Sequence, residues 1–118
     1  ISVDEPQAHL QEMVAELANQ TADRLGETFT FKAEDILVNT DYIGGGYGVL
    51  DTPEIEAIRL FAKTEGLLLD PVYTGRAAAG MVDLIRKGFF KKDETVLFWH
   101  TGGLPALFAE PYAKVLDK

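Results

Sequence analysis

Two side chains with hydroxyl groups, Tyr73 and Thr74, stand in the stretch EGLLLDPVYTGRAAAG at residues 65–80. The three leucines at 67–69 form a short apolar run, which is typical of a strand buried on both faces of a parallel sheet. An Asp-Pro pair ends this strand, and a helix rich in small residues is expected from Arg76 to Lys87. The two hydroxyls therefore lie in a strand-to-helix loop, where open α/β sheets bind ligands.

Two further loops carry the same kinds of residue. The first, NTDYIGGGYGVL at residues 39–50, follows a predicted strand at 35–38 and contains Tyr47 among several glycines. These glycines let backbone approach a ligand closely, but their spacing matches neither the dinucleotide fingerprint nor the P-loop. The second, HTGG, follows a predicted strand at 95–99 and contributes Thr101.

The order of predicted elements alternates helices and strands, which predicts an α/β fold with a parallel sheet flanked by helices. We expect residues 1–118 to form one such α/β segment. Because the carboxyl ends of parallel strands meet at one edge, the three loops should open together. A site there has hydroxyls, two helix N-termini and Arg76 as its main positive charge, and suits a small polar or anionic molecule.

Each of these residues also has a purely structural interpretation. Thr74 and Thr101 are good N-caps for the helices that follow them. Tyr73 can equally be a half-buried tyrosine whose hydroxyl is already hydrogen-bonded. Three further structural expectations are a loop brace for Asp70, a structural hydrogen bond for His100 and a core position for Trp99.

Three more helices are expected. An amphipathic helix with one buried face covers residues 4–25, because apolar residues recur there at three- and four-residue spacing. A second helix covers 52–65, with proline in its first turn and glycine after its end. The last begins at Leu104-Pro105 and runs to about Leu116, and residues 28–32 form either an edge strand or a connection.

Composition and charge restrict the classes of partner. The net charge of -8 and the pI of about 4.6 argue against binding to nucleic acid or to an anionic membrane surface, since no basic stripe offsets the acids. The chain has no cysteine, and His9 and His100 lie too far apart for a metal-ligand spacing, so no metal site is expected. A cytoplasmic location is expected. The start at Ile1 without methionine suggests a piece of a longer polypeptide.

The loops and their flanking helices resemble a known family. Residues 44–88, from GGGYGVLDTPE to DLIRKG, and the later VLFWHTGGLPALF resemble the carboxyl-terminal part of certain pyridoxal-phosphate (PLP) enzymes. This family groups D-cysteine desulfhydrase with 1-aminocyclopropane-1-carboxylate deaminase, and the resemblance runs from about Asp35 to Phe108. It implies a tryptophan-synthase-β-like fold (fold type II) with two α/β domains and PLP between them, of which this chain is the carboxyl-terminal part.

The resemblance also implies roles for single residues. Tyr47 and Tyr73 are implied to be catalytic and to contact a small amino-acid substrate. Thr74, Thr101 and Gly102 are implied to bind the cofactor. Thr74 would approach the pyridine nitrogen, and Thr101 would also line the substrate pocket.

The two threonines favour one branch of the family. The deaminase branch carries glutamate where Thr74 stands and leucine where Thr101 stands, so this chain is more similar to the desulfhydrase branch, which converts D-cysteine to pyruvate, sulfide and ammonia. A neutral hydroxyl beside the ring nitrogen does not stabilise a pyridinium as a carboxylate would. Leu50, Arg76 and Glu110 depart from the family's usual proline, lysine and aromatic residue. 1-Aminocyclopropane-1-carboxylate deaminase and L-cysteate sulfo-lyase therefore stay open as alternatives.

A PLP enzyme needs a lysine that holds the cofactor covalently, and none of the lysines of this chain falls in the three loops. We therefore expect an inactive carboxyl-terminal fragment of a parent enzyme that is a homodimer. Two hypotheses of other classes are a non-catalytic module that binds small molecules, and an assembly module whose open faces are covered by a missing domain or a second copy.

Overall fold

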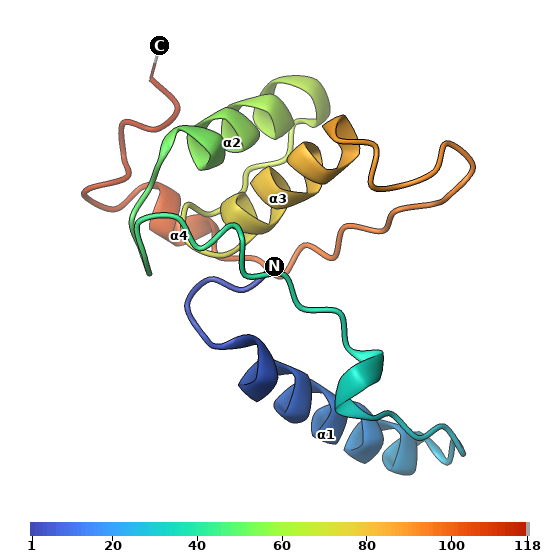
Figure 1. Ribbon diagram of the computed structural model, residues 1–118. Coiled ribbons are helices and arrows are strands. Elements are labelled where there is room, and N and C mark those ends of the chain that lie inside the picture. Colours follow the sequence, from blue (N-terminus) through green and yellow to red (C-terminus); the bar gives the residue numbers. More distant parts are fainter. Residues whose placement is uncertain (118) are drawn as a thin grey trace.

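The computed structural model describes residues 1–117. The described chain consists of helices joined by irregular segments (Figure 1). In chain order the helices are α1 (Gln7–Leu25), the 3₁₀ helix η1 (Ala33–Asp35), α2 (Thr52–Glu65), α3 (Thr74–Arg86) and α4 (Leu104–Leu107).

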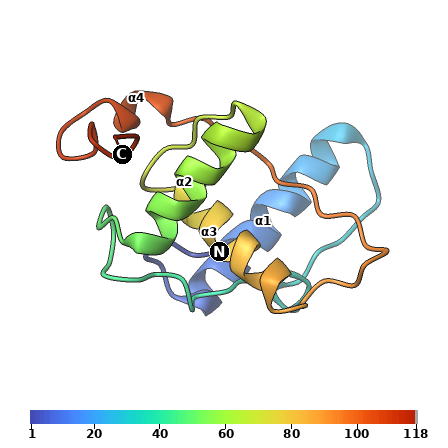
Figure 2. The same cartoon turned by 90° about the horizontal axis from the view of Figure 1, so that it is seen from above.

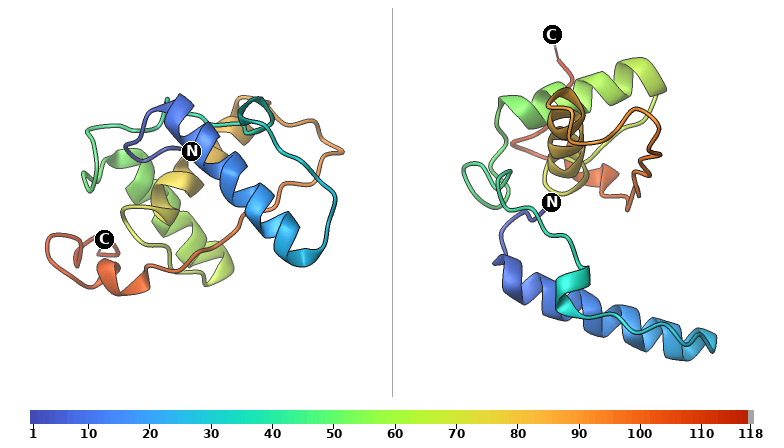
Figure 3. Two further views of the ribbon diagram at one scale, coloured as in Figure 1. Left: turned by 90° about the horizontal axis from the view of Figure 1, so that it is seen from below. Right: turned by 45° about the vertical axis from the view of Figure 1, so that its right-hand side comes forward.

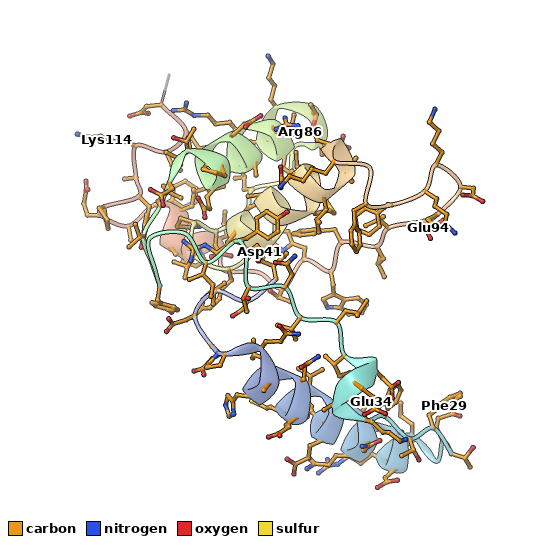
Figure 4. All side chains as sticks on the ribbon, viewed as in Figure 1. Phe29, Glu34, Asp41, Arg86, Glu94 and Lys114 are labelled. Carbon is orange, nitrogen blue, oxygen red and sulfur yellow. The ribbon has the colours of Figure 1, made fainter. Side chains whose placement is uncertain are left out.

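The helices fall into two lobes. One lobe holds α2, α3 and α4, and the other holds α1 with η1 (Figure 1 and Figure 3, right). Figure 4 shows Phe29 and Glu34 in the α1 lobe, well away from Arg86 and Lys114 in the other. The Cα radius of gyration is 15.9 Å, against about 13.5 Å for a compact domain of this length. The molecule is therefore elongated.

Helix α2 matches the predicted range because its end signals are local. Its N-cap is Asp51, and Asp51 and Glu54 form a reciprocal capping box. Pro53 lies in the first turn, and Gly66 ends the helix in the left-handed conformation at φ 67°.

The core lies where α2 and α3 pack side by side, a contact visible in both Figure 1 and Figure 2. Gly75 in the first turn of α3 is essential to this contact, because a Cβ there would lie 2.5 Å from the carbonyl oxygen of Asp70 and 3.0 Å from Ile58 Cδ1. The buried apolar side chains of this core are Ala57, Ile58, Leu69, Ala78, Ala79, Leu107 and Val115.

Helix α1 ends at Leu25 as predicted, but it begins at Gln7 and not at residue 4, and the predicted buried face is wrong. Only Ala15 and Ala22 of this helix are buried, while Leu17 is 61% exposed. The helix contacts η1 and the connection before it, where the Asn19 side chain bonds both the N–H and the carbonyl of Phe31. None of the helices in residues 1–117 combines the length and hydrophobicity that crossing a membrane would need.

The predicted parallel sheet is wrong for the described chain, since residues 1–117 contain no strand. Residues 35–38 begin in η1, and the expected strands at 67–69 and 95–99 lie outside any helix or strand. Their apolar runs are local signals, whereas a sheet also needs a neighbouring backbone about 4.8 Å away that exchanges hydrogen bonds. No backbone hydrogen bond within residues 1–117 joins these segments to one another.

Two other expectations at the carboxyl-terminal end are wrong. Trp99 is 77% exposed instead of lying in the core, because no paired strand covers it. The last helix ends at Leu107 and continues as turns, not as a helix to Leu116. Pro111 stands in that stretch, and proline lacks the N–H that a continuing helix needs.

Candidate functional site

The loop before α3 is organised by one buried carboxylate. Asp70 is 1% exposed, and its Oδ1 accepts hydrogen bonds from the N–H groups of Val72 (2.8 Å) and Tyr73 (2.7 Å). Its Oδ2 accepts from the N–H of Thr74 (2.7 Å) and from the Thr74 hydroxyl (2.6 Å). The same hydroxyl accepts from the N–H of Asp70 at 2.8 Å. Asp70 thus braces its loop, as the sequence predicted.

These bonds also set the charge of Asp70. Burial alone raises the pKa of the Asp70 carboxyl, but the hydrogen bonds from the Thr74 hydroxyl and the three backbone N–H groups outweigh it and lower that pKa below its usual range. The carboxylate is therefore ionised at the positive end of α3. The expectation that this helix N-terminus attracts an external anion is wrong, because the chain's own anion occupies it.

The two tyrosines that the sequence singled out meet in space. The hydroxyls of Tyr47 and Tyr73 are hydrogen-bonded to each other, and their rings lie 5.8 Å apart, edge to face at 68°. Tyr47 is 55% exposed and Tyr73 is 49% exposed, so both rings remain open to small molecules. The hydrogen bond from Tyr47 raises the pKa of the Tyr73 hydroxyl above its usual range, with burial as a smaller cause.

A cavity of about 300 Å³ lies beside this pair. Tyr73, Thr74 and Thr101 line it, together with Phe98 and Trp99 and with parts of the first ten residues. Three predicted site residues therefore share one cavity. Tyr47 is not among its lining residues and reaches it only through the Tyr73 hydroxyl, and Gly102 is also outside it.

The HTGG segment is held beside Asp70. His100 binds the carbonyl of Leu68 through Nε2 (3.2 Å) and accepts from the N–H of Gly102 through Nδ1 (3.0 Å), so it has the structural role that the sequence predicted. A Cβ on Gly103 would lie 2.7 Å from the Asp70 Cγ, which shows how closely the two loops approach.

The predicted capping roles of the threonines are wrong. Thr74 is the first residue of α3, and its hydroxyl donates to Asp70 Oδ2 instead of capping the helix. The residue before α4 is Gly103, and no side chain caps that helix, so Thr101 is free of this role. Its place on the cavity wall accords better with the ligand-binding role than with the structural one.

Comparison with known proteins identifies the family. A family model described as "Pyridoxal-phosphate dependent enzyme" matches residues 3–102. The chain belongs to the pyridoxal-phosphate dependent enzymes. It is 44% identical over 100 residues to a protein of Methylobacterium nodulans and 43% identical over 106 residues to one of Methylobacterium sp. strain 4-46, both named 1-aminocyclopropane-1-carboxylate deaminase.

These matches cover 85% and 90% of this chain but only 30% and 32% of the relatives. The chain thus spans about a third of the length of the curated relatives it matches. Family membership confirms the resemblance inferred from the motifs, and PLP as the cofactor of the family. The family implies fold type II, although the described residues contain helices and no sheet.

The residues of the cavity fit one side of a PLP site. Tyr73, Thr74 and Thr101 line a wall that also carries the aromatic Phe98 and Trp99, which suits a flat heteroaromatic ring with polar substituents. The Thr74 hydroxyl itself is bonded to Asp70. No lysine is among the lining residues within the described chain. No group of three or more histidines, aspartates and glutamates in residues 1–117 is placed to hold a metal ion.

Sequence reasoning missed one feature beside the site. Arg76, expected to face a ligand, is 1% exposed and forms a buried ion pair with Glu54. It is therefore not available to an anionic molecule in the cavity. The capping-box spacing of Asp51 and Glu54 was the only signal of this arrangement in the sequence.

Proposed function

We propose that this chain is part of a PLP-dependent lyase that acts on a small amino acid, with D-cysteine desulfhydration as its reaction. The observation that supports the proposal most directly is the shared cavity of Tyr73, Thr74 and Thr101, beside the Tyr47–Tyr73 hydroxyl pair, in a chain of this family. When bound, PLP supplies an electron sink that stabilises negative charge on the carbon next to the amino group.

The tyrosine pair is proposed to handle a proton at the Tyr73 hydroxyl. Like any tyrosine, Tyr73 carries its proton at neutral pH, and the Tyr47 bond raises the pKa of the Tyr73 hydroxyl further, so Tyr73 is proposed to act as a donor. Tyr47 is the neighbour that holds the phenol in place. Both rings are half exposed, so a substrate amino acid can approach Tyr73 from the cavity.

Thr74 is proposed to lie at the cofactor ring. Its hydroxyl donates to Asp70 Oδ2 and accepts from the N–H of Asp70, so it has one lone pair and no proton left for a further bond. Threonine is neutral where the deaminase branch carries a glutamate, and this difference in residue type supports the desulfhydrase branch. Thr101 and Gly102 complete the proposed cofactor contacts.

The second candidate is deamination of 1-aminocyclopropane-1-carboxylate, which the printed names of both relatives favour. The products released by the natural full-length polypeptide, assayed with PLP added, distinguish the two candidate reactions. Sulfide release from D-cysteine supports the first, and ammonia release from 1-aminocyclopropane-1-carboxylate supports the second. Sulfite release from L-cysteate would indicate the sulfo-lyase alternative, and no product from any of them would overturn the proposal.

The threonines are tested by exchange in the same polypeptide. Thr74→Glu together with Thr101→Leu should lower kcat/KM for D-cysteine by at least about tenfold, which corresponds to about 1.4 kcal/mol. Thr95→Leu, outside the cavity, is the matched control. If sulfide release were unchanged in the double variant, the roles given to Thr74 and Thr101 would be wrong.

The assembly and location of the parent enzyme are also proposals. We propose a homodimer that works in the cytoplasm on a small amino acid, without nucleic-acid or membrane partners. The 118-residue chain alone is expected to be inactive, since no lysine lines the cavity within the described residues. Light scattering of the full-length polypeptide and an activity assay of the chain alone test these statements.

A further inference from the structure

Arg76 is a buried charge that the proposed reaction does not use. It lies in the first turn of α3, and its Nε donates to Glu54 Oε1 of α2 at 2.9 Å. Glu54 is itself only 3% exposed. A buried arginine is tolerated when it is paired and its remaining donors are bonded. Where those donors point therefore shows what the side chain holds in place.

The donors point at the glycine-rich loop. Nη2 donates to the carbonyl of Val49 at 2.7 Å, and Nη1 donates to the carbonyls of Gly46 at 3.0 Å and Val3 at 3.2 Å. Gly46 and Val49 flank Tyr47 in the sequence. Because the guanidinium is planar and rigid, these bonds fix both sides of Tyr47 in one geometry.

The same loop is tied to α2 through Glu54. Its Oε2 accepts from the N–H of Asp51 at 3.2 Å, and Asp51 Oδ2 accepts from the N–H of Gly45 at 3.3 Å. A Cβ on Gly45 would lie 2.8 Å from Val49 Cγ1, so the loop is folded closely on itself. Glu54 thus connects Arg76, the capping box of α2 and the loop.

We propose that Arg76, held by Glu54, is a positioning residue that keeps Tyr47 against Tyr73. Arg76 follows Tyr73 by three residues at the same end of α3, so a loop bonded to Arg76 has a fixed place relative to Tyr73. The catalytic use of the tyrosine pair rests on the proposed function, whereas the positioning itself rests only on these contacts.

Lysine is the informative replacement, because it keeps the charge. Its single ammonium has three donors on one nitrogen and cannot reproduce the fork that joins Glu54 to the carbonyls of Gly46 and Val49. The loop should then loosen, and Tyr47 should spend less time in contact with Tyr73.

The test is an NMR titration of ring-labelled tyrosines in the natural full-length polypeptide. Tyr73 is assigned with Tyr73→Phe, and Tyr47→Phe defines the titration of Tyr73 without its partner. In Arg76→Lys the Tyr73 midpoint should move down toward that of Tyr47→Phe. The matched control is Arg86→Lys in the same helix, whose ion pair with Glu56 is exposed, and it should leave the midpoint unchanged.

Glu54→Gln covers the case in which Arg76→Lys fails to fold. Glutamine keeps a carbonyl acceptor for Nε but loses the charge and the second oxygen that accepts from the N–H of Asp51, so a downward shift of the Tyr73 midpoint is expected. The inference is overturned if Tyr73 titrates as in the wild type in every folded variant. Since the titration needs no turnover, a failure of the D-cysteine assay leaves this result standing, and the reverse also holds.

Discussion

Asp70 shows how one residue can set the geometry of the site. It lies behind the cavity, not in it, and fixes Val72, Tyr73 and Thr74 through four accepted hydrogen bonds. The Asp-Pro pair in the sequence predicted a loop brace. It could not predict that the Asp70 carboxylate would occupy the positive end of α3. That outcome depends on the distance between a carboxylate and the helix that follows, which only the fold determines.

Asp70→Asn should therefore destabilise the full-length polypeptide by about 2 kcal/mol at pH 7, because an amide cannot accept all four bonds and leaves a buried donor unsatisfied. The folded pKa of Asp70 is lowered, so its contribution is present above the unfolded pKa of about 4 and is lost as the pH falls through the folded value. The difference between wild type and variant, measured by urea unfolding, should shrink as the pH falls below about 4. Asp93→Asn, on an exposed loop, is the control. A difference that stayed constant with pH would contradict an ionised Asp70.

Helices α2 and α3 were predictable because their signals are local. In α2 a capping box, a first-turn proline and a terminal glycine mark the ends, so the predicted 52–65 matches the structure. Helix α3 lies between the Asp-Pro pair and Gly88, and its predicted range of 76–87 differs from the observed Thr74–Arg86 by a turn or less. The contact between the two helices was not predictable. It depends on which glycine of α3 meets α2, and the sequence of α3 offers two, Gly75 and Gly80.

These two glycines make a matched pair of variants. A Cβ at position 75 would lie 2.5 Å from the backbone oxygen of Asp70, which cannot turn away, whereas at position 80 it would meet the flexible end of Ile1 at 2.7 Å. Both changes gain about 1 kcal/mol of helix propensity. Gly75→Ala should nevertheless cost about 2 to 3 kcal/mol more than Gly80→Ala in the free energy of unfolding. Equal stabilities in thermal unfolding would show that α3 can shift away from Asp70.

At the scale of the whole molecule, the sequence predicted extended segments and an arrangement of loops, but not the absence of a sheet from residues 1–117. Two of the three predicted loops line one cavity, and the third contacts them through the Tyr47–Tyr73 hydrogen bond, although no ladder aligns the segments that precede the loops. Local apolar runs cannot specify pairing, because the partner of a strand lies elsewhere in the chain. Some apolar side chains of these runs consequently face solvent, Leu37 and Leu97 among them, whereas Leu69 is buried in the core.

The fluorescence of Trp99 can report the solvent exposure of the 95–99 segment directly, since Trp99 is the one tryptophan of the 118-residue sequence. It lies on the cavity wall and is largely exposed. In the 118-residue chain its fluorescence should resemble that of a tryptophan in water and should be quenched by acrylamide almost as readily as free N-acetyltryptophanamide. The quenching should be the same at low and high protein concentration if the chain remains a monomer. Protection of Trp99 from acrylamide that grows with protein concentration would mean that a second copy covers the 95–99 segment, which favours the assembly module. Protection of Trp99 at every concentration would contradict the open structure around it.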